Sequence, residues 1–173
     1  MTRNGLTHPR DPAHWPAPSA HGSPVSGTVA VPGSKSLTNR YLVLAALASG
    51  ASVVRKPLHS RDSALMVTAL EQLGAAVTEL PDPGPFGPDL RIDPVSPGAV
   101  LDGPVTVDCG LAGTVMRFVP PVAALCSGTV VLDGDDAARV RPMAPVVEGL
   151  RQLGVRVEDG GRGTLPLSVV GTG

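Results

Sequence analysis

Apolar positions alternate along this chain between helical and strand-like spacing, and the alternation predicts its secondary structure. Helical spacing predicts helices at about residues 35–48, 62–73, 113–126 and 142–153. Short β-branched runs predict strands between the helices, among them a strand from Thr28, one at 90–93 and one at 165–170. The order of helices and strands indicates an α/β (α+β) fold.

Glycine and proline mark the ends of the predicted helices. Gly74 and Gly154 follow the second and the fourth helix, where a C-cap in the left-handed region favours glycine. Pro142 falls in the first turn of the fourth helix, where its missing N–H is tolerated.

The chain also contains an internal repeat. Two segments match in order, TVAVPGSKSLTNRYLVLAALASGASVV (28–54) and TVDCGLAGTVMRFVPPVAALCSGTVVL (106–132). Each has a strand, a glycine turn, a helix opening and a second β-branched run. The segments that follow them contain Arg61 and Arg141 at matching places and share the string L-x-Q-L-G-x-x-V. This self-similarity predicts repeated β-α-β-α-β-β units.

The repeat divides the chain into predicted parts. These are a disordered tail (1–24), a first unit (25–93), a linker (94–104) and a second unit (105–173). The tail is rich in Pro and His and is expected to be disordered at least as far as Trp15, and its histidines lack metal-ligand spacing. The Pro/Gly-rich stretch 81–89 is predicted to be a surface loop.

Composition and charge narrow the classes of function. The chain is 42% hydrophobic with 14 basic and 15 acidic residues, so it lacks the basic excess of a nucleic-acid binder. No apolar run approaches the roughly 18 residues that span a membrane, and no signal peptide is seen. Cys109 and Cys126 lie in apolar stretches and are predicted to be buried thiols rather than a disulfide, which fits a cytoplasmic protein.

The string PGSKSLTNR (32–40) has the pattern of an anion site at a helix opening. Free backbone N–H groups and the helix dipole favour an anion there. Lys35 adds a charge, Ser36 a hydroxyl donor, and Arg40 lies one helical turn after Ser36 on the same face. The alternative is that Ser34 or Ser36 only caps the helix while the cations are solvated.

The string CGLAGTVMR (109–117) stands at the matching place in the second unit. Gly110 and Gly113 allow close approach of backbone to a ligand, Thr114 can cap the helix, and Arg117 lies one turn after Gly113. Two such openings indicate two anion subsites. The alternative is a helix start built from small residues for packing alone.

Arg61 and Arg141 are each predicted at the N-terminal end of a helix, where the dipole disfavours a cation. Each therefore requires a carboxylate partner or a ligand. Asp62 is the local candidate for Arg61, and the aspartates of 133–136 are the candidates for Arg141. The pair alone leaves the two explanations open.

Taken together, VPGSKSLTNR (31–40), GLAGTVMR (110–117) and ARVRPM (138–143) resemble the enolpyruvyl transferases that act on shikimate 3-phosphate. The resemblance extends from about Val25 to Gly171. It implies transfer of the enolpyruvyl group of phosphoenolpyruvate to the 5-hydroxyl of shikimate 3-phosphate, with release of phosphate. It also implies two domains of three β-α-β-α-β-β units each, of which this chain carries two units of one domain.

The resemblance implies roles for particular residues. Lys35 would contact both substrates, Ser36 and Arg40 would hold shikimate 3-phosphate, and Gly113 and Arg141 would hold phosphoenolpyruvate, with Thr114 and Arg117 on the same wall. It implies no cofactor and no metal. Leu111 stands where the family often has Asn, and Phe118 where many members have Pro.

The length of the chain implies that it lacks the third unit and the second domain of the family, and with them every catalytic residue. We expect a monomer for the full-length family member. The alternatives are an inactive fragment, an anion-binding module, or the sister transferase that acts on UDP-N-acetylglucosamine. That transferase typically has Lys-Asn where this chain has Lys35-Ser36. RNA 3′-phosphate cyclases share the repeat, but the charge balance argues against them.

Overall fold

The computed structural model describes residues 18–81 and 84–173, and the chain divides into two units, 1–31 and 32–173. In the first unit, residues 18–31 are exposed and form no helix or strand. The strand predicted from Thr28 is therefore wrong, since a strand requires a hydrogen-bonded neighbour and these residues have no ladder. The predictions about the start of the tail, including Trp15, lie outside the described residues.

The second unit contains the predicted helices within a few residues of their expected bounds. They are α1 (Lys35–Ala46), α2 (Arg61–Gln72), α3 (Gly113–Ala124) and α5 (Ala144–Gln152). A further short helix, α4 (Asp136–Arg139), was not predicted. Helix α5 begins after Pro142, so the proline in its first turn is Pro145 and the prediction for Pro142 is wrong. Gly74 and Gly154 have φ values of 102° and 85°, which confirms the left-handed C-caps.

The strands between residues 52 and 93 form an antiparallel sheet. They are β1 (Ser52–Val54), β2 (Ala76–Glu79) and β3 (Leu90–Asp93), in the order β1-β3-β2. Val53 pairs with Arg91, and Val77 pairs with Ile92. The prediction of a strand at 90–93 is confirmed, and this strand is central because both neighbours bond to it.

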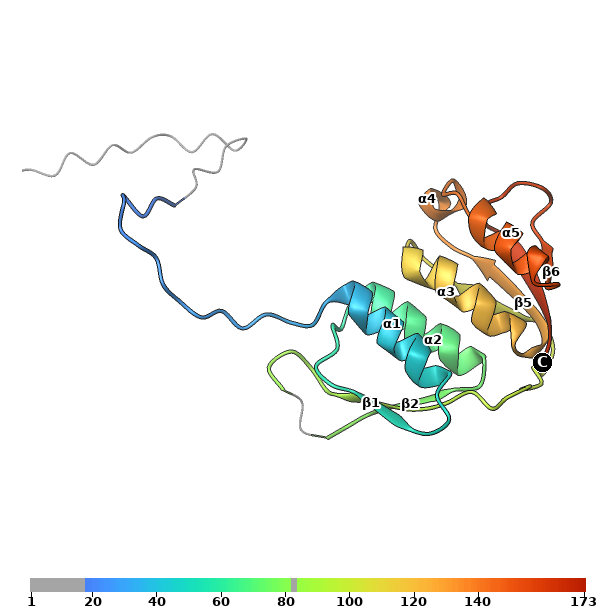
Figure 1. Cartoon of the computed structure of the whole chain (residues 1–173), viewed down its shortest axis with the longest axis horizontal. Helices are drawn as coiled ribbons and strands as arrows, with labels where there is room; N and C mark the ends of the chain where they lie inside the picture. The colour runs from blue at the N-terminus through green and yellow to red at the C-terminus, as the bar shows by residue number, and fades with distance from the viewer. Residues whose placement is uncertain (1–17, 82–83) are drawn as a thin grey trace, which may run out of the picture. The chain divides into compact units, whose positions relative to one another are not determined.

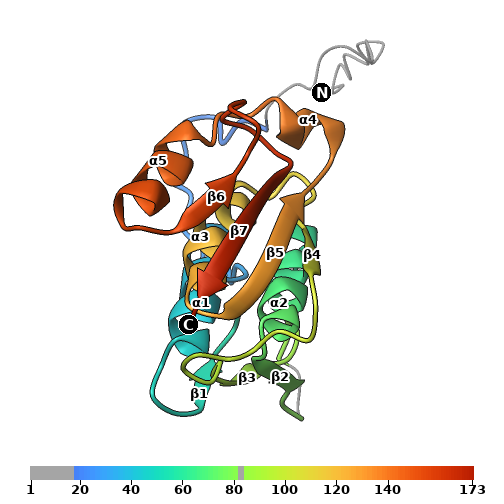
Figure 2. The same ribbon diagram turned by 90° about the vertical axis from the view of Figure 1, so that its right-hand side faces the viewer.

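The strands after residue 104 form a second, mixed sheet. They are β4 (Val105–Asp108), β5 (Ser127–Asp133), β6 (Arg156–Glu158) and β7 (Leu167–Thr172), in the order β4-β5-β7-β6. β4 and β5 are parallel and are joined through α3, whereas the other pairs are antiparallel. Figure 2 shows this order across the face of the sheet.

Helices α1, α2 and α3 lie side by side and share one core (Figure 1). α1 and α2 pack on the first sheet, while α3 packs on both of them and on the second sheet. Leu42, Met66 and Met116, one from each helix, are fully buried. The shared core therefore places the N-terminal ends of these helices near one another.

Both cysteines are free and buried, as predicted. Burial raises the pKa of the Cys109 thiol to about 12, with Asp108 and Asp133 adding to the effect. Over the described residues, no helix is long and apolar enough to cross a membrane, and no cluster of His, Cys, Asp and Glu has the arrangement of a metal site.

Candidate anion-binding site

The Ser34 side chain caps the N-terminal end of α1. Ser34 has extended backbone at the N-cap, and its Oγ accepts a hydrogen bond from the Leu37 N–H at 3.5 Å. Gly33 precedes it, and a Cβ there would clash with the Lys56 carbonyl oxygen. The close approach of backbone explains the glycine of this turn.

The predicted donors of α1 lie on its first turns. Lys35 Nζ forms an ion pair with Asp62 Oδ2 at 2.9 Å, which connects the N-terminal ends of α1 and α2. Ser36 is exposed, and its carbonyl oxygen accepts a hydrogen bond from Arg40 Nη1 at 3.0 Å. Arg40 is thereby folded back along its own helix toward the opening.

The opening of α3 is built differently, since no side chain caps it. The Asp108 carboxylate accepts from the Gly110 N–H at 2.7 Å, and Gly110 has φ +48°, in the left-handed region. This turn leads into Gly113 at the start of the helix. With no capping side chain, the α3 opening retains N–H groups for a ligand.

Arg117 and Arg141 converge on Gly113. Arg117 Nη1 donates to the Gly113 carbonyl at 3.2 Å, and Arg141 Nη1 donates to the Leu111 carbonyl at 2.9 Å. A Cβ added at Gly113 would lie 3.1 Å from Arg117 Nη1 and 3.4 Å from Arg141 Nη2. The absence of a side chain at Gly113 therefore leaves room for two guanidinium groups above the uncapped helix end.

Two contacts join the α1 opening to the α3 opening. Asn39, fully buried, donates from Nδ2 to Thr114 Oγ1 at 2.6 Å and to the Asp62 carbonyl at 3.3 Å. The guanidinium carbon of Arg40 lies 5.2 Å from the centre of the Phe118 ring. Adjacent residues of α1 thus contact residues one turn apart on α3, so the two openings are held side by side.

The carboxylate partners differ from those that local sequence predicts. Asp62 pairs with Lys35, whereas Arg61 forms a two-pronged ion pair with Asp135, at 2.8 Å for each bond. The prediction of Asp62 for Arg61 is therefore wrong. The cause is packing of α2 against the second sheet, which brings a distant loop closer than the neighbouring carboxylate.

Arg141 also lacks the predicted acidic partner. The nearby Arg139 forms ion pairs with both Asp133 and Asp136. Arg141 instead donates a hydrogen bond to the Leu111 carbonyl. Hydrogen bonding by Arg139 lowers the pKa of Asp133 below its usual range. The prediction of an aspartate from 133–136 for Arg141 is thus wrong.

These pairings leave an excess of positive charge at the two openings. Across residues 18–81 and 84–173, no carboxylate forms an ion pair with Arg40, Arg117 or Arg141. The site thus combines three such guanidinium groups, Lys35 and an uncapped helix end. This arrangement suits an oxyanion such as phosphate or carboxylate.

Comparison with known proteins identifies the family of the chain. The sequence profile of EPSP synthase (3-phosphoshikimate 1-carboxyvinyltransferase) matches residues 19–173. The chain belongs to the EPSP synthase family. It is 76% identical over all 173 residues to a Kocuria rhizophila protein named 3-phosphoshikimate 1-carboxyvinyltransferase, of which it covers 39%.

Solved structures of the family support the same fold. EPSP synthase from Acinetobacter baumannii superposes with a TM-score of 0.68 at 26% sequence identity, over 84% of this chain and 32% of that one. A second structure of that enzyme, described at 2.37 Å, gives the same values. The predicted family and the α/β fold are confirmed, and the chain spans about two fifths of the length of the curated relative.

Sequence reasoning placed Lys35, Ser36 and Arg40 at the α1 opening and Gly113, Thr114 and Arg117 at the α3 opening, and the structure brings these openings together. Arg141 was predicted at the start of the fourth helix, but it lies between α4 and α5, with its guanidinium group beside Gly113. The sequence reasoning missed Asn39 and the ion pair between Lys35 and Asp62. The signal for Asn39 was its place within the Thr-Asn-Arg string, next to Arg40, but the helical pattern alone does not reveal a buried amide. Its partner, Thr114, is distant in sequence.

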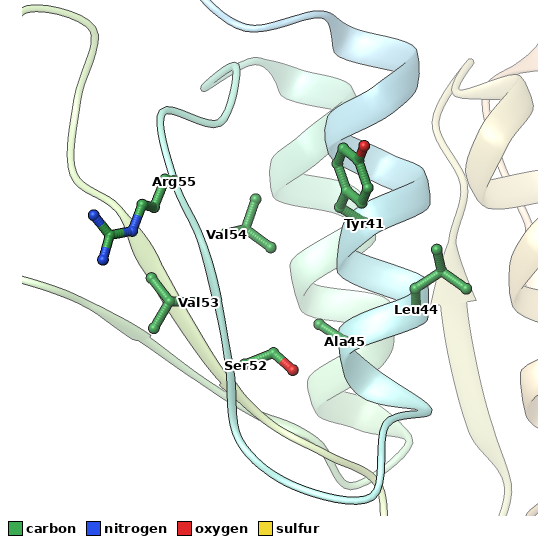
Figure 3. A pocket seen from close by; sticks show the side chains of 7 residues that line it. All are labelled: Tyr41, Leu44, Ala45, Ser52, Val53, Val54 and Arg55. Carbon is green, nitrogen blue, oxygen red and sulfur yellow. The ribbon is translucent and has the colours of Figure 1, made fainter.

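A separate hollow lies between α1 and β1, with a volume of about 390 Å³. Figure 3 shows Tyr41 and Leu44 of α1 on one side and Val53 and Arg55 on the other. Its lining is mostly aliphatic, with Arg55 as its charged member. The hollow is not lined by any of the predicted site residues.

Proposed function

We propose that this chain forms part of the substrate-binding wall of a 3-phosphoshikimate 1-carboxyvinyltransferase. The enzyme would transfer the enolpyruvyl group of phosphoenolpyruvate to the 5-hydroxyl of shikimate 3-phosphate and release phosphate. The proposal rests on the convergence of Arg117 and Arg141 over the uncapped Gly113, beside the cations of α1. Family membership and the 76% sequence identity to the Kocuria rhizophila relative support the proposal.

The two substrates match the two openings in charge. Phosphoenolpyruvate carries a phosphate and a carboxylate, which suit the paired guanidinium groups at Gly113. Shikimate 3-phosphate would be held by Ser36 and Arg40, with Lys35 between the two substrates. Both ligands need a fixed orientation before the new C–O bond forms, and Asn39 holds the two openings in register through Thr114.

We assign no general acid or base to this chain. The carboxylates that contact the openings are already engaged: Asp62 by Lys35, Asp135 by Arg61, and Asp108 by the Gly110 N–H. The Cys109 thiol is buried, and its pKa of about 12 keeps it protonated at neutral pH. We therefore place proton transfer in the part of the relatives that this chain does not cover. We also propose a cytoplasmic location, which two free thiols favour, and a monomer.

Calorimetric titration of the chain with each substrate tests the binding half of this proposal. We expect Arg141→Ala to weaken phosphoenolpyruvate binding about tenfold or more, because a charge-assisted hydrogen bond is lost. Arg139→Ala removes the same charge two residues away, from a side chain that Asp133 and Asp136 already engage, and should change the affinity less than about twofold. A folded chain that binds neither substrate would contradict the proposal.

Phosphate release tests the assignment of proton transfer. We expect no release from the chain with both substrates, and release when the uncovered part of the Kocuria rhizophila relative is added. Release by the chain alone that Lys35→Met abolishes would show that the proton-transfer groups lie within these residues. Binding without release even after that addition would favour an anion-binding module instead.

A further inference from the structure

Phe118 occupies a place between the two openings. It follows Arg117 on α3 and is half-buried against the shared core. The core-facing positions of α3, including Val115, Val119 and Val122, are aliphatic and almost fully buried. Phe118 lies beside this face, and its ring contacts Arg40 of α1 at 5.2 Å from guanidinium carbon to ring centre.

The contact lies within the range of a cation–π interaction. A guanidinium group that stacks through its face keeps its N–H bonds in the plane, where they can donate to an oxyanion. Arg40 Nη1 already donates to the Ser36 carbonyl at 3.0 Å. The ring and this hydrogen bond therefore fix Arg40 at two points, while Nε and Nη2 keep donors for a ligand.

We propose that Phe118 is a positioning residue: its ring holds the Arg40 guanidinium at the α1 opening, ready to bind an oxyanion group of shikimate 3-phosphate. The inference rests on the proposed function, since it deepens the account of the same site. An aliphatic side chain would fill the core edge equally well, but it offers no π face to a cation. The aromatic ring thus gives Arg40 a contact in addition to packing against the core.

The contact itself can be tested without ligand. Stacking over a ring shifts the NMR signal of the Arg40 Nε–H group through the ring current. In Phe118→Leu we expect this signal to move toward the position of an exposed arginine, and in Phe118→Trp to stay displaced. Phe86 is the other phenylalanine of the chain and is half-buried in the loop before β3, so Phe86→Leu is the matched control. It should leave the Arg40 signal unchanged.

The consequence for binding is tested by titration with shikimate 3-phosphate. We expect Phe118→Leu to weaken binding about two- to fivefold, the range of an exposed cation–π contact. Phe118→Trp and Phe118→Tyr should bind with about the affinity of the unchanged chain, and so should Phe86→Leu. Rescue by another aromatic residue separates positioning from a merely structural role. If Phe118→Leu unfolds, the affinities of Phe118→Trp and Phe118→Tyr are compared with that of Phe118→Met instead.

A double-mutant cycle with Arg40→Ala decides whether Phe118 acts through Arg40. If it does, Phe118→Leu has no further effect once Arg40 is removed. Equal affinity of Phe118→Leu and the unchanged chain would overturn the inference while leaving the proposed function intact. Additive losses would also overturn it. Failure of the unchanged chain to bind shikimate 3-phosphate would overturn the inference even if the Arg40 signal shows the contact, and failure to bind either substrate would overturn the proposed function as well.

Discussion

The two helix openings of the site share a position in the repeat but differ in how their ends are satisfied. At α1, the Ser34 hydroxyl caps the helix, and Lys35 is neutralised by Asp62. At α3, no side chain caps the helix, and two arginines without carboxylate partners among the described residues lie over Gly113. The α3 opening is therefore the stronger anion site.

The difference shows how a repeated element can be stabilised in one copy and left open in the other. A capped end contributes to stability because its backbone donors are paired, whereas an uncapped end keeps them for a ligand. The α3 opening is held in shape by the surrounding loop instead. Arg61, Asp135 and Gly110 fix that loop, with the Asp135 N–H donating to the Gly110 carbonyl at 3.0 Å.

The largest expected effect follows from removing the amide that joins the two openings. Asn39→Ala would leave the Thr114 hydroxyl and the Asp62 carbonyl without their shared donor in the core. We expect the free energy of unfolding to fall by about 2–3 kcal/mol. Urea denaturation measures it. In a cycle with Thr114→Ala, the double variant should lose less than the sum of the single losses, and strict additivity would refute the link.

Filling the α3 opening should have the next largest effect, on binding rather than on folding. In Gly113→Ala, the atoms nearest to the new Cβ are the side-chain ends of Arg117 and Arg141, so we expect the helix to persist while the guanidinium groups are displaced. We expect phosphoenolpyruvate affinity to fall about tenfold, or about 1.4 kcal/mol. Gly149→Ala on α5, where nothing lies within 4 Å of the added Cβ, is the control. Unchanged affinity in Gly113→Ala would contradict the assignment.

A smaller effect is expected from the loop that supports the α3 opening, and it should depend on pH. Hydrogen bonding by Arg61 lowers the pKa of Asp135 below its usual range. Because the folded pKa is lowered, this stabilisation is present above the unfolded value of about 4 and is lost as pH falls through the folded value. The melting temperature of Asp135→Asn should therefore lie below that of the unchanged chain at pH 7, and the gap should close on acidification.

The control for this loop is Asp136→Asn. Among the residues that the structure describes, Asp136 forms an ion pair with Arg139 alone, and its side chain is 98% exposed. We expect almost no change in melting temperature at any pH. A gap for Asp135→Asn that stays constant down to pH 2 would mean that the ion pair with Arg61 does not stabilise the loop.

The smallest effect is expected at the capped opening. Ser34→Ala removes an N-cap whose hydrogen bond is long, 3.5 Å, so we expect a loss of about 0.5 kcal/mol in the free energy of unfolding. Phosphoenolpyruvate affinity should stay the same. A loss of affinity comparable to that of Gly113→Ala would mean that the two openings do not differ in the way described.

Several parts of the molecule could be predicted from sequence because they depend on local pattern. The helices follow from apolar spacing, and the C-caps at Gly74 and Gly154 follow from the need for a left-handed residue. The absence of a strand from Thr28 could not be predicted in this way. Its β-branched pattern is intact, but a strand also depends on a neighbour, and residues 18–31 form none.

The sequence by itself determined the family, the four longer helices and the residues on the first turns of α1 and α3. It did not place Arg141, which only the tertiary structure brings to Gly113. Tertiary structure alone decided the pairings: Lys35 with Asp62, Arg61 with Asp135, and Asn39 with Thr114. The physical reason is range. Helical spacing and turn chemistry act over a few residues, whereas a buried amide or a guanidinium group takes whichever partner the packing of α1, α2 and α3 brings within reach.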